Sequence, residues 1–254
     1  MRTKTRHGAD HHTATDNSGC ATAPQLLRAL RAAADPTRVP VLQSFFRTNR
    51  GEYAEGDLFI GVTVPSIRAL AKRFGDVPLE EIETLLLCPV HEARLLALVL
   101  LVEAFRAGDA RQQRRIYTLY LSRTDRINNW DLVDSSAPPI VGGWLADRSR
   151  APLTKLATSR SLWERRIAIV ATHFFIRQGD LAETLRIADI LLDDPHDLIH
   201  KAVGWMLREA GKQDPEAERR FLASRHTRMP RTMLRYAIER FPDRERRNYL
   251  IRPR

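Results

Sequence analysis

The sequence is poor in cysteine and glycine, and it has no long hydrophobic run. Its two cysteines, Cys20 and Cys88, are too few for a disulfide framework or a cysteine metal cluster. The apolar segments lack alternating β-branched residues, which argues against a β-rich fold. No stretch reaches the ~18 consecutive apolar residues that span a bilayer, and the first residues lack the apolar core of a signal peptide. We therefore expect a reducing, cytoplasmic setting and no membrane association.

Basic residues are what the sequence has in excess. The net charge is +10 and the isoelectric point is about 10.3. Only five of the 41 basic residues are lysine, so 36 are arginine, the better bidentate ligand for phosphate. This balance favours an anionic polymer as the partner. The alternative is a soluble basic protein whose charge has no such role.

The apolar segments are rich in leucine, alanine and arginine and follow a helical period, which predicts an all-α fold. We interpret residues 1–21 as a disordered polar tail, in which His11 and His12 are solvated rather than metal ligands. Residues 22–254 contain no Gly- or Ser-rich linker, so we expect one domain. The expected helices span 24–34, 36–46, 66–74, 78–87, 92–107, 110–121, 129–136, 139–146, 153–158, 161–178, 181–192, 196–210, 215–224, 231–241 and 244–251.

The short helix expected at 129–136 carries an unusual pair of side chains. Trp130 and Asp134 are four residues apart and therefore share one helical face. An indole is poorly suited to solvent, and a carboxylate is poorly suited to burial without a partner. Either this face is a functional site, or the pair is a partly buried tryptophan beside an ordinary surface aspartate.

A repeat runs through the central and C-terminal parts of the chain. The apolar pattern aligns one set of positions at intervals of 36, 36, 35 and 34 residues, and a second set lies four residues further on. Helix-pair repeats of this length are typical of a HEAT-like solenoid. The first set is Arg94, Trp130, Arg166, Lys201 and Arg235, and the second is Leu98, Asp134, Val170, Trp205 and Glu239.

Equivalent positions of a solenoid stack in columns on one side of the array. If that side is concave, basic side chains line a groove with Trp130, Asp134 and Trp205 near its middle. Such a groove suits a phosphate backbone, so we expect Arg94, Arg166, Lys201 and Arg235 to bind DNA. The alternative is that these are ordinary exposed helix residues whose register is chance.

Several of these stretches resemble the AlkD-type DNA alkylation-repair family, over roughly Leu26 to Tyr249. The family's tryptophan and aspartate four residues apart, its downstream arginine and its later tryptophan fall on Trp130, Asp134, Arg166 and Trp205. Many members have two adjacent tryptophans, and Asn129 stands at the first of those places here. The similar stretches are 51–53, 56–57, 61–65, 129–134, 163–169, 201–209 and 233–239.

The resemblance implies a monomeric, cofactor-free DNA glycosylase that removes cationic N3- or N7-alkylated purines from double-stranded DNA without extruding the base into a pocket. Asp134 would then stabilise the cationic sugar and activate water. Trp130 and Trp205 would bracket the deoxyribose, and Arg166 would hold the adjacent phosphate.

Three other functions remain open on the sequence. The first is a non-catalytic helical-repeat module that binds DNA or protein. The second is a nuclease, which would need a carboxylate cluster for metal, whereas Asp131 and Asp134 have no evident third acid. The third is a self-resistance glycosylase that acts on one bulky natural-product adduct.

Overall fold

The structure is a computed structural model that describes residues 20–251, and this part of the chain is helical apart from its loops. An isolated bridge between Leu58 and Val90 is its only extended pairing in that range. None of the helices in residues 20–251 is long and apolar enough to cross a membrane. The predicted tail lies almost entirely outside the described residues, as do His11 and His12.

The helices follow the expected order closely. They are α1 (Ala23–Ala32), α2 (Val39–Phe46), α3 (Val64–Phe74), α4 (Leu79–Leu86), α5 (His91–Ala107), α6 (Ala110–Ser122), α7 (Trp130–Ala137), α8 (Ala151–Ala157), α9 (Leu162–Ala171), α10 (His173–Ile176), α11 (Ala182–Ile190), α12 (Asp197–Gln213), α13 (Pro215–Ala223), α14 (Arg231–Ala237) and α15 (Asp243–Leu250). Single turns η1 (Pro36–Arg38) and η3 (Ile238–Arg240) are 3₁₀-helical, and η2 (Pro138–Gly142) is π-helical.

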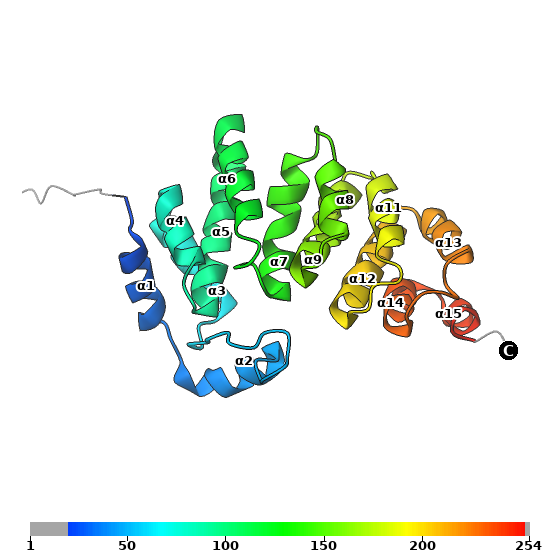
Figure 1. The fold of residues 1–254 in the computed structure, drawn as a ribbon, viewed down its shortest axis with the longest axis horizontal. Helices are drawn as coiled ribbons and strands as arrows, with labels where there is room; N and C mark the ends of the chain where they lie inside the picture. Colours follow the sequence, from blue (N-terminus) through cyan, green and yellow to red (C-terminus); the bar gives the residue numbers. More distant parts are fainter. Residues whose placement is uncertain (1–19, 252–254) are drawn as a thin grey trace, which may run out of the picture.

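The helices stack in two rows that form an arc, as Figure 1 shows. The inner side of the arc is lined by α3, α5, α7, α9, α12 and α14, and the outer row includes α4, α6, α8, α11 and α13. Leu98, Ile167 and Val203 are fully buried in the core that runs along the whole array. This architecture confirms the predicted all-α, HEAT-like solenoid.

Two predicted helices differ from the structure: 139–146 begins as the π-helical turn η2 and ends in turns, and 161–178 is interrupted at one point. The segment 161–178 is not continuous, because the chain breaks at Thr172 between α9 and α10. The hydroxyl of Thr172 donates a 2.7 Å hydrogen bond to the carbonyl of Ile169 and so competes with the helical pattern. The break also presses against Gly142, where an added Cβ would lie only 2.4 Å from the carbonyl oxygen of Ala171. The glycine therefore permits this close approach.

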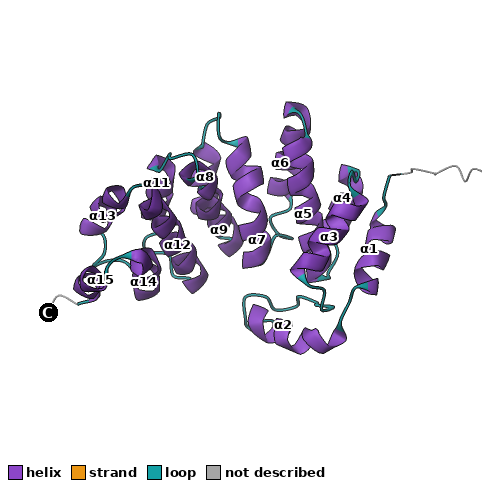
Figure 2. Ribbon diagram, turned by 180° about the vertical axis from the view of Figure 1, so that it is seen from behind, coloured by secondary structure: helices purple, strands orange, loops and turns teal. Residues whose placement is uncertain are grey.

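The segment between α1 and α3 departs from the two-row pattern. Helix α2 lies apart from both rows, on the inner side of the arc and next to the start of α3 (Figure 2). The loop that follows α2 is fixed by Glu92, whose carboxylate accepts hydrogen bonds from the backbone N–H groups of residues 60–62. Gly61 has φ +87°, and an added Cβ would lie 1.9 Å from the carbonyl oxygen of Asp35. The loop is thereby held against the start of α5.

Candidate functional site

Asp134 and Arg166 form a bidentate ion pair on the inner row of helices. Arg166 Nε and Nη2 donate to the two carboxylate oxygens of Asp134 at 2.9 and 2.8 Å. Nη1 of Arg166 donates to the carbonyl of Leu198 at 2.6 Å, so one guanidinium joins α7, α9 and α12. The Arg166 side chain is 6% exposed and that of Asp134 is 19% exposed. The arginine is thus enclosed, while part of the carboxylate reaches solvent.

The surroundings of Asp134 make it a stronger base than an exposed aspartate. Burial raises the pKa of Asp134, and the charge and hydrogen bonds of Arg166 oppose that rise. The ion pair favours the ionised form, and the burial strengthens its attraction for a proton or a nearby cation. An ionised, partly accessible carboxylate of this kind can stabilise positive charge or accept a proton from water.

Trp130 begins α7 one turn before Asp134 and is packed against aromatic side chains of α2. Its ring stacks on Phe46 with centroids 5.4 Å apart and meets Phe45 edge-on at 5.7 Å. Burial raises the pKa of the Tyr53 phenol, and a hydrogen bond with Trp130 opposes that rise. Tyr53 also meets Trp163 of α9 edge-on at 6.1 Å. An aromatic cluster therefore surrounds the N-terminal end of α7.

A buried polar network lies beneath this cluster. His91 is hydrogen-bonded through Nε2 to Asp131 at 2.8 Å and through Nδ1 to Asp57 at 3.1 Å. Burial alone would lower the pKa of His91, but the two carboxylates outweigh it and raise the pKa to about 9. Because Asp131 is in the first turn of α7, the imidazolium ties that turn to α5 and to the loop that carries Asp57.

The same network encloses Arg94, which the sequence analysis expected to bind DNA, and Asn129. Arg94 is 3% exposed, and its Nη2 donates to Asp57 at 2.6 Å, so it is enclosed in the network and not placed to contact phosphate. Asn129 is fully buried, accepts a 2.8 Å hydrogen bond from the backbone N–H of Trp130 and donates to Asp57 at 3.3 Å. This asparagine therefore caps α7 and anchors it to the loop that carries Asp57.

The remaining predicted residues are not in direct contact with Asp134. Trp205 comes seven residues after Leu198 on α12, about 10 Å along the helix. Its ring lies 5.9 Å from that of His173, and its Nε1 donates to Glu209 at 3.2 Å. Lys201 is partly exposed and pairs with Asp197 at 2.8 Å. Arg235 on α14 is exposed and forms no ion pair within the described residues.

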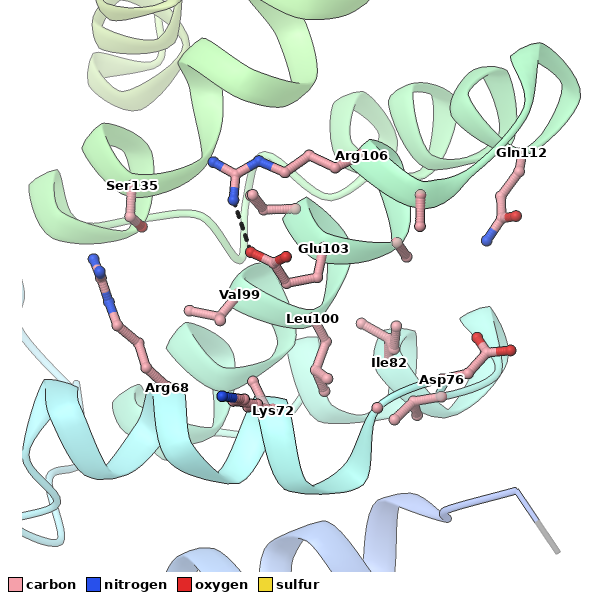
Figure 3. A pocket seen from close by; sticks show the side chains of 16 residues that line it. Arg68, Lys72, Asp76, Ile82, Val99, Leu100, Glu103, Arg106, Gln112 and Ser135 are labelled. Atoms are coloured by element: carbon pink, nitrogen blue, oxygen red, sulfur yellow. Dashed lines mark hydrogen bonds and ion pairs between the residues drawn. The ribbon is translucent and has the colours of Figure 1, made fainter. Parts of the chain in front are cut away.

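A cleft of about 910 Å³ opens beside the site, between α3 and α5 (Figure 3). It begins at Ser135, the neighbour of Asp134, and Arg68 extends from α3 toward that serine. Arg68 and Lys72 are exposed and unpaired within residues 20–251. These two cations lie on α3, in a repeat that precedes the one carrying Asp134. The sequence analysis had expected Arg94 to supply the positive charge on that side.

Sequence signals are weak for the residues of this site between α2 and the start of α5. The Phe45–Phe46 pair lies in an uncharged apolar stretch, which suggests core packing rather than a site. Asp57 and His91 belong to no motif whose spacing indicates contact. In the described part of the chain, no group of three His, Cys, Asp or Glu side chains is placed to hold a metal ion.

Together, the fold and these contacts define a HEAT-like repeat protein whose inner row of helices carries a guanidinium-bound carboxylate one turn from an indole. The chain belongs to the DNA alkylation repair enzyme family, whose pattern it matches over residues 26–241. Its role therefore lies in the repair of alkylated DNA.

Solved structures share this fold at low sequence identity. A predicted DNA alkylation repair enzyme from Enterococcus faecalis superposes with a TM-score of 0.65 at 16% identity, covering 83% of this chain and 97% of that one. AlkD2 from Streptococcus mutans gives a TM-score of 0.52 at 15% identity, covering 87% and 97%. A comparison with curated proteins gave no match.

Proposed function

We propose that this protein is a monofunctional DNA glycosylase. It hydrolyses the N-glycosidic bond of cationic N3- and N7-alkylated purines, such as 3-methyladenine and 7-methylguanine, in double-stranded DNA. The observation that carries the proposal is the partly exposed carboxylate of Asp134. Arg166 donates hydrogen bonds to both of its oxygens, and Asp134 lies one helical turn from Trp130. In a DNA alkylation repair enzyme, this is the group suited to a cationic sugar.

The chemistry needs little from the protein beyond charge and position. An alkylated purine is already cationic, so when the bond from C1′ breaks, the electron pair leaves with the base and neutralises it. The sugar becomes oxocarbenium-like, and the carboxylate of Asp134 stabilises that charge. Water then attacks C1′ and loses a proton to Asp134, whose raised pKa suits it to this task. The products are the free alkylated base and an abasic site.

The other side chains bind and orient the DNA. The face of Trp130 attracts a cationic sugar through its negative quadrupole, and Trp205 forms a second wall further along the groove. Arg166 is a positioning residue, because its contacts hold Asp134 rather than a phosphate. The exposed Arg68 and Arg235 and the partly exposed Lys201 bind phosphates on either side of the modified nucleotide.

The first prediction concerns Asp134→Asn. We expect the single-turnover rate of base release to fall by ~100-fold or more, the effect of losing one such electrostatic group. Binding to alkylated DNA should be nearly unchanged. The measurement is release of 7-methylguanine and 3-methyladenine from methylated duplex DNA, and Ser135→Ala, the exposed neighbour, is the matched control.

The outcomes separate the alternatives. Wild-type protein that binds DNA but releases no base would be a binding module. Strand cleavage that a chelator abolishes would indicate a nuclease. An Asp134→Asn variant as fast as wild type would remove the carboxylate from the mechanism. Release of bulky adducts but not of methylated bases would indicate the self-resistance glycosylase.

A further inference from the structure

Helix α2 is apolar yet largely uncovered. Its eight residues include six apolar ones and no charged one, but only Phe46 is buried. Val41 is 71% exposed and Phe45 is 61% exposed. The two lie four residues apart and therefore form one ridge along the helix. Apolar surface this exposed, on one short element, indicates a partner that covers it.

The ridge is continuous with the proposed active site. Phe45 meets the ring of Trp130 edge-on at 5.7 Å, and Phe46 stacks on the same ring at 5.4 Å. Figures 1 and 2 show α2 on the inner side of the arc, outside both helix rows. DNA that places a nucleotide against Trp130 and Asp134 therefore passes over α2.

The charges around the ridge favour an anionic partner. Arg38 precedes α2, and Arg47 and Arg50 follow it, and all three are exposed. Arg47 is 3.5 Å from Glu52, an exposed pair that holds the guanidinium only weakly. An apolar ridge between cations fits the sugar edges of a nucleic-acid groove, with phosphates on both sides.

We propose that Val41 and Phe45 form an apolar wedge that enters the minor groove of DNA at the modified nucleotide. The minor groove is about 6 Å wide, which admits side chains but not a helix. Apolar side chains that enter it partly unstack a base step and bend the duplex. This inference rests on the proposed function, and it assigns to α2 the task of displacing the nucleotide toward Trp130 and Asp134.

A second copy of this chain fits the ridge less well. The eight residues of α2 span only about 12 Å, much less than a surface of ~800 Å² per partner requires. A two-fold contact there would also bring the Arg38, Arg47 and Arg50 side chains of both copies together, and like charges repel.

The test compares Phe45→Ala and Val41→Ala with Leu87→Ala, another exposed apolar residue, which ends α4. The probe is a duplex with an uncleavable cationic aza-sugar in place of the modified nucleotide and 2-aminopurine in the neighbouring position. We expect wild-type binding to raise 2-aminopurine fluorescence, which reports unstacking. Phe45→Ala should abolish that rise and weaken probe binding by about 10-fold, the size of one base–aromatic stack. Phe45→Leu should restore part of the rise.

The outcomes distinguish the wedge from the glycosylase. An unchanged fluorescence rise and probe affinity in Phe45→Ala, with base release still lost in Asp134→Asn, would overturn the wedge alone. A wild-type protein that unstacks the probe through Phe45 but releases no base would support the wedge and overturn the proposed function. Wild-type dimers in sedimentation that Phe45→Ala dissociates would make the occupant a second copy and overturn the wedge.

Discussion

Arg166 has three of its hydrogen-bonding groups engaged within the protein. Nε and Nη2 hold Asp134, and Nη1 holds the carbonyl of Leu198, so only two of the five guanidinium N–H groups remain. The sequence suggested a phosphate contact for this residue, and the geometry instead supports orientation of the carboxylate. A bidentate pair fixes the plane of a carboxylate, which a single ammonium does not.

The second prediction follows from this geometry. Arg166→Lys keeps the charge but loses the fork, so we expect base release to slow by roughly 10- to 100-fold, the range expected when orientation is lost. The salt dependence of DNA binding should stay close to that of wild type. Both are measured by single-turnover release and by binding at several salt concentrations. A slope that falls by about one would instead identify a phosphate contact.

At the scale of helices and loops, the repeat predicted which helices carry the candidate site. It did not predict that the arginines of these helices bind aspartates of the protein instead of phosphates. Periodicity located α7 and α9 and placed Trp130, Asp134 and Arg166 in adjacent repeats. Arg94 occupies the repeat position equivalent to Arg166, and each arginine binds an aspartate that precedes it in the chain, Asp57 or Asp134. A buried guanidinium needs such a partner.

The sequence pattern did not reveal that partner for Arg94. Asp57 lies in a loop, and loop contacts follow no period. The position of Trp205 relative to Asp134 likewise depends on how α9 and α12 are staggered, which repeat spacing does not report. Periodic apolar residues fix the packed faces of helices, whereas the polar site depends on contacts between elements distant in sequence.

The third prediction concerns the network that joins α7 to α5. The pKa of His91 is about 9 in the folded state and near its ordinary value of 6.5 when unfolded. The stabilisation is therefore complete below pH 6.5 and is lost as pH rises through 9. We expect the contribution of His91 to the free energy of unfolding to fall by on the order of 3 kcal/mol over this range, measured as the difference between wild type and His91→Gln in urea denaturation.

Two variants identify which residues cause the free energy of unfolding to fall as pH rises. His91→Gln should remove most of the dependence between pH 6.5 and 9. Burial raises the pKa of Glu218 to about 8, so folded Glu218 also binds its proton more tightly than unfolded Glu218, and stability declines as pH rises toward 8. Glu218→Gln should therefore remove a separate decrease in the free energy of unfolding, which begins at lower pH. An unaltered slope in His91→Gln would contradict a charged imidazole in the network.

At the scale of the whole molecule, exposed cations without an ion-pair partner among residues 20–251 lie on both rows of the arc. Arg68 on α3 and Arg235 on α14 belong to the inner row, near opposite ends of the array. Arg114 on α6 belongs to the outer row and is also exposed. The net charge of +10 attracts DNA to either surface, so charge alone does not show which surface binds.

The fourth prediction uses that difference. Each protein–phosphate contact contributes about 0.9 to the slope of log affinity against log salt concentration. Arg68→Gln and Arg235→Gln should each reduce the slope by about one, whereas Arg114→Gln should leave it unchanged. All three substitutions remove one positive charge, so a general effect of net charge would alter the three slopes alike. Equal reductions would mean that DNA is not confined to the inner side, and the carboxylate of Asp134 would then lose the strand on which it is proposed to act.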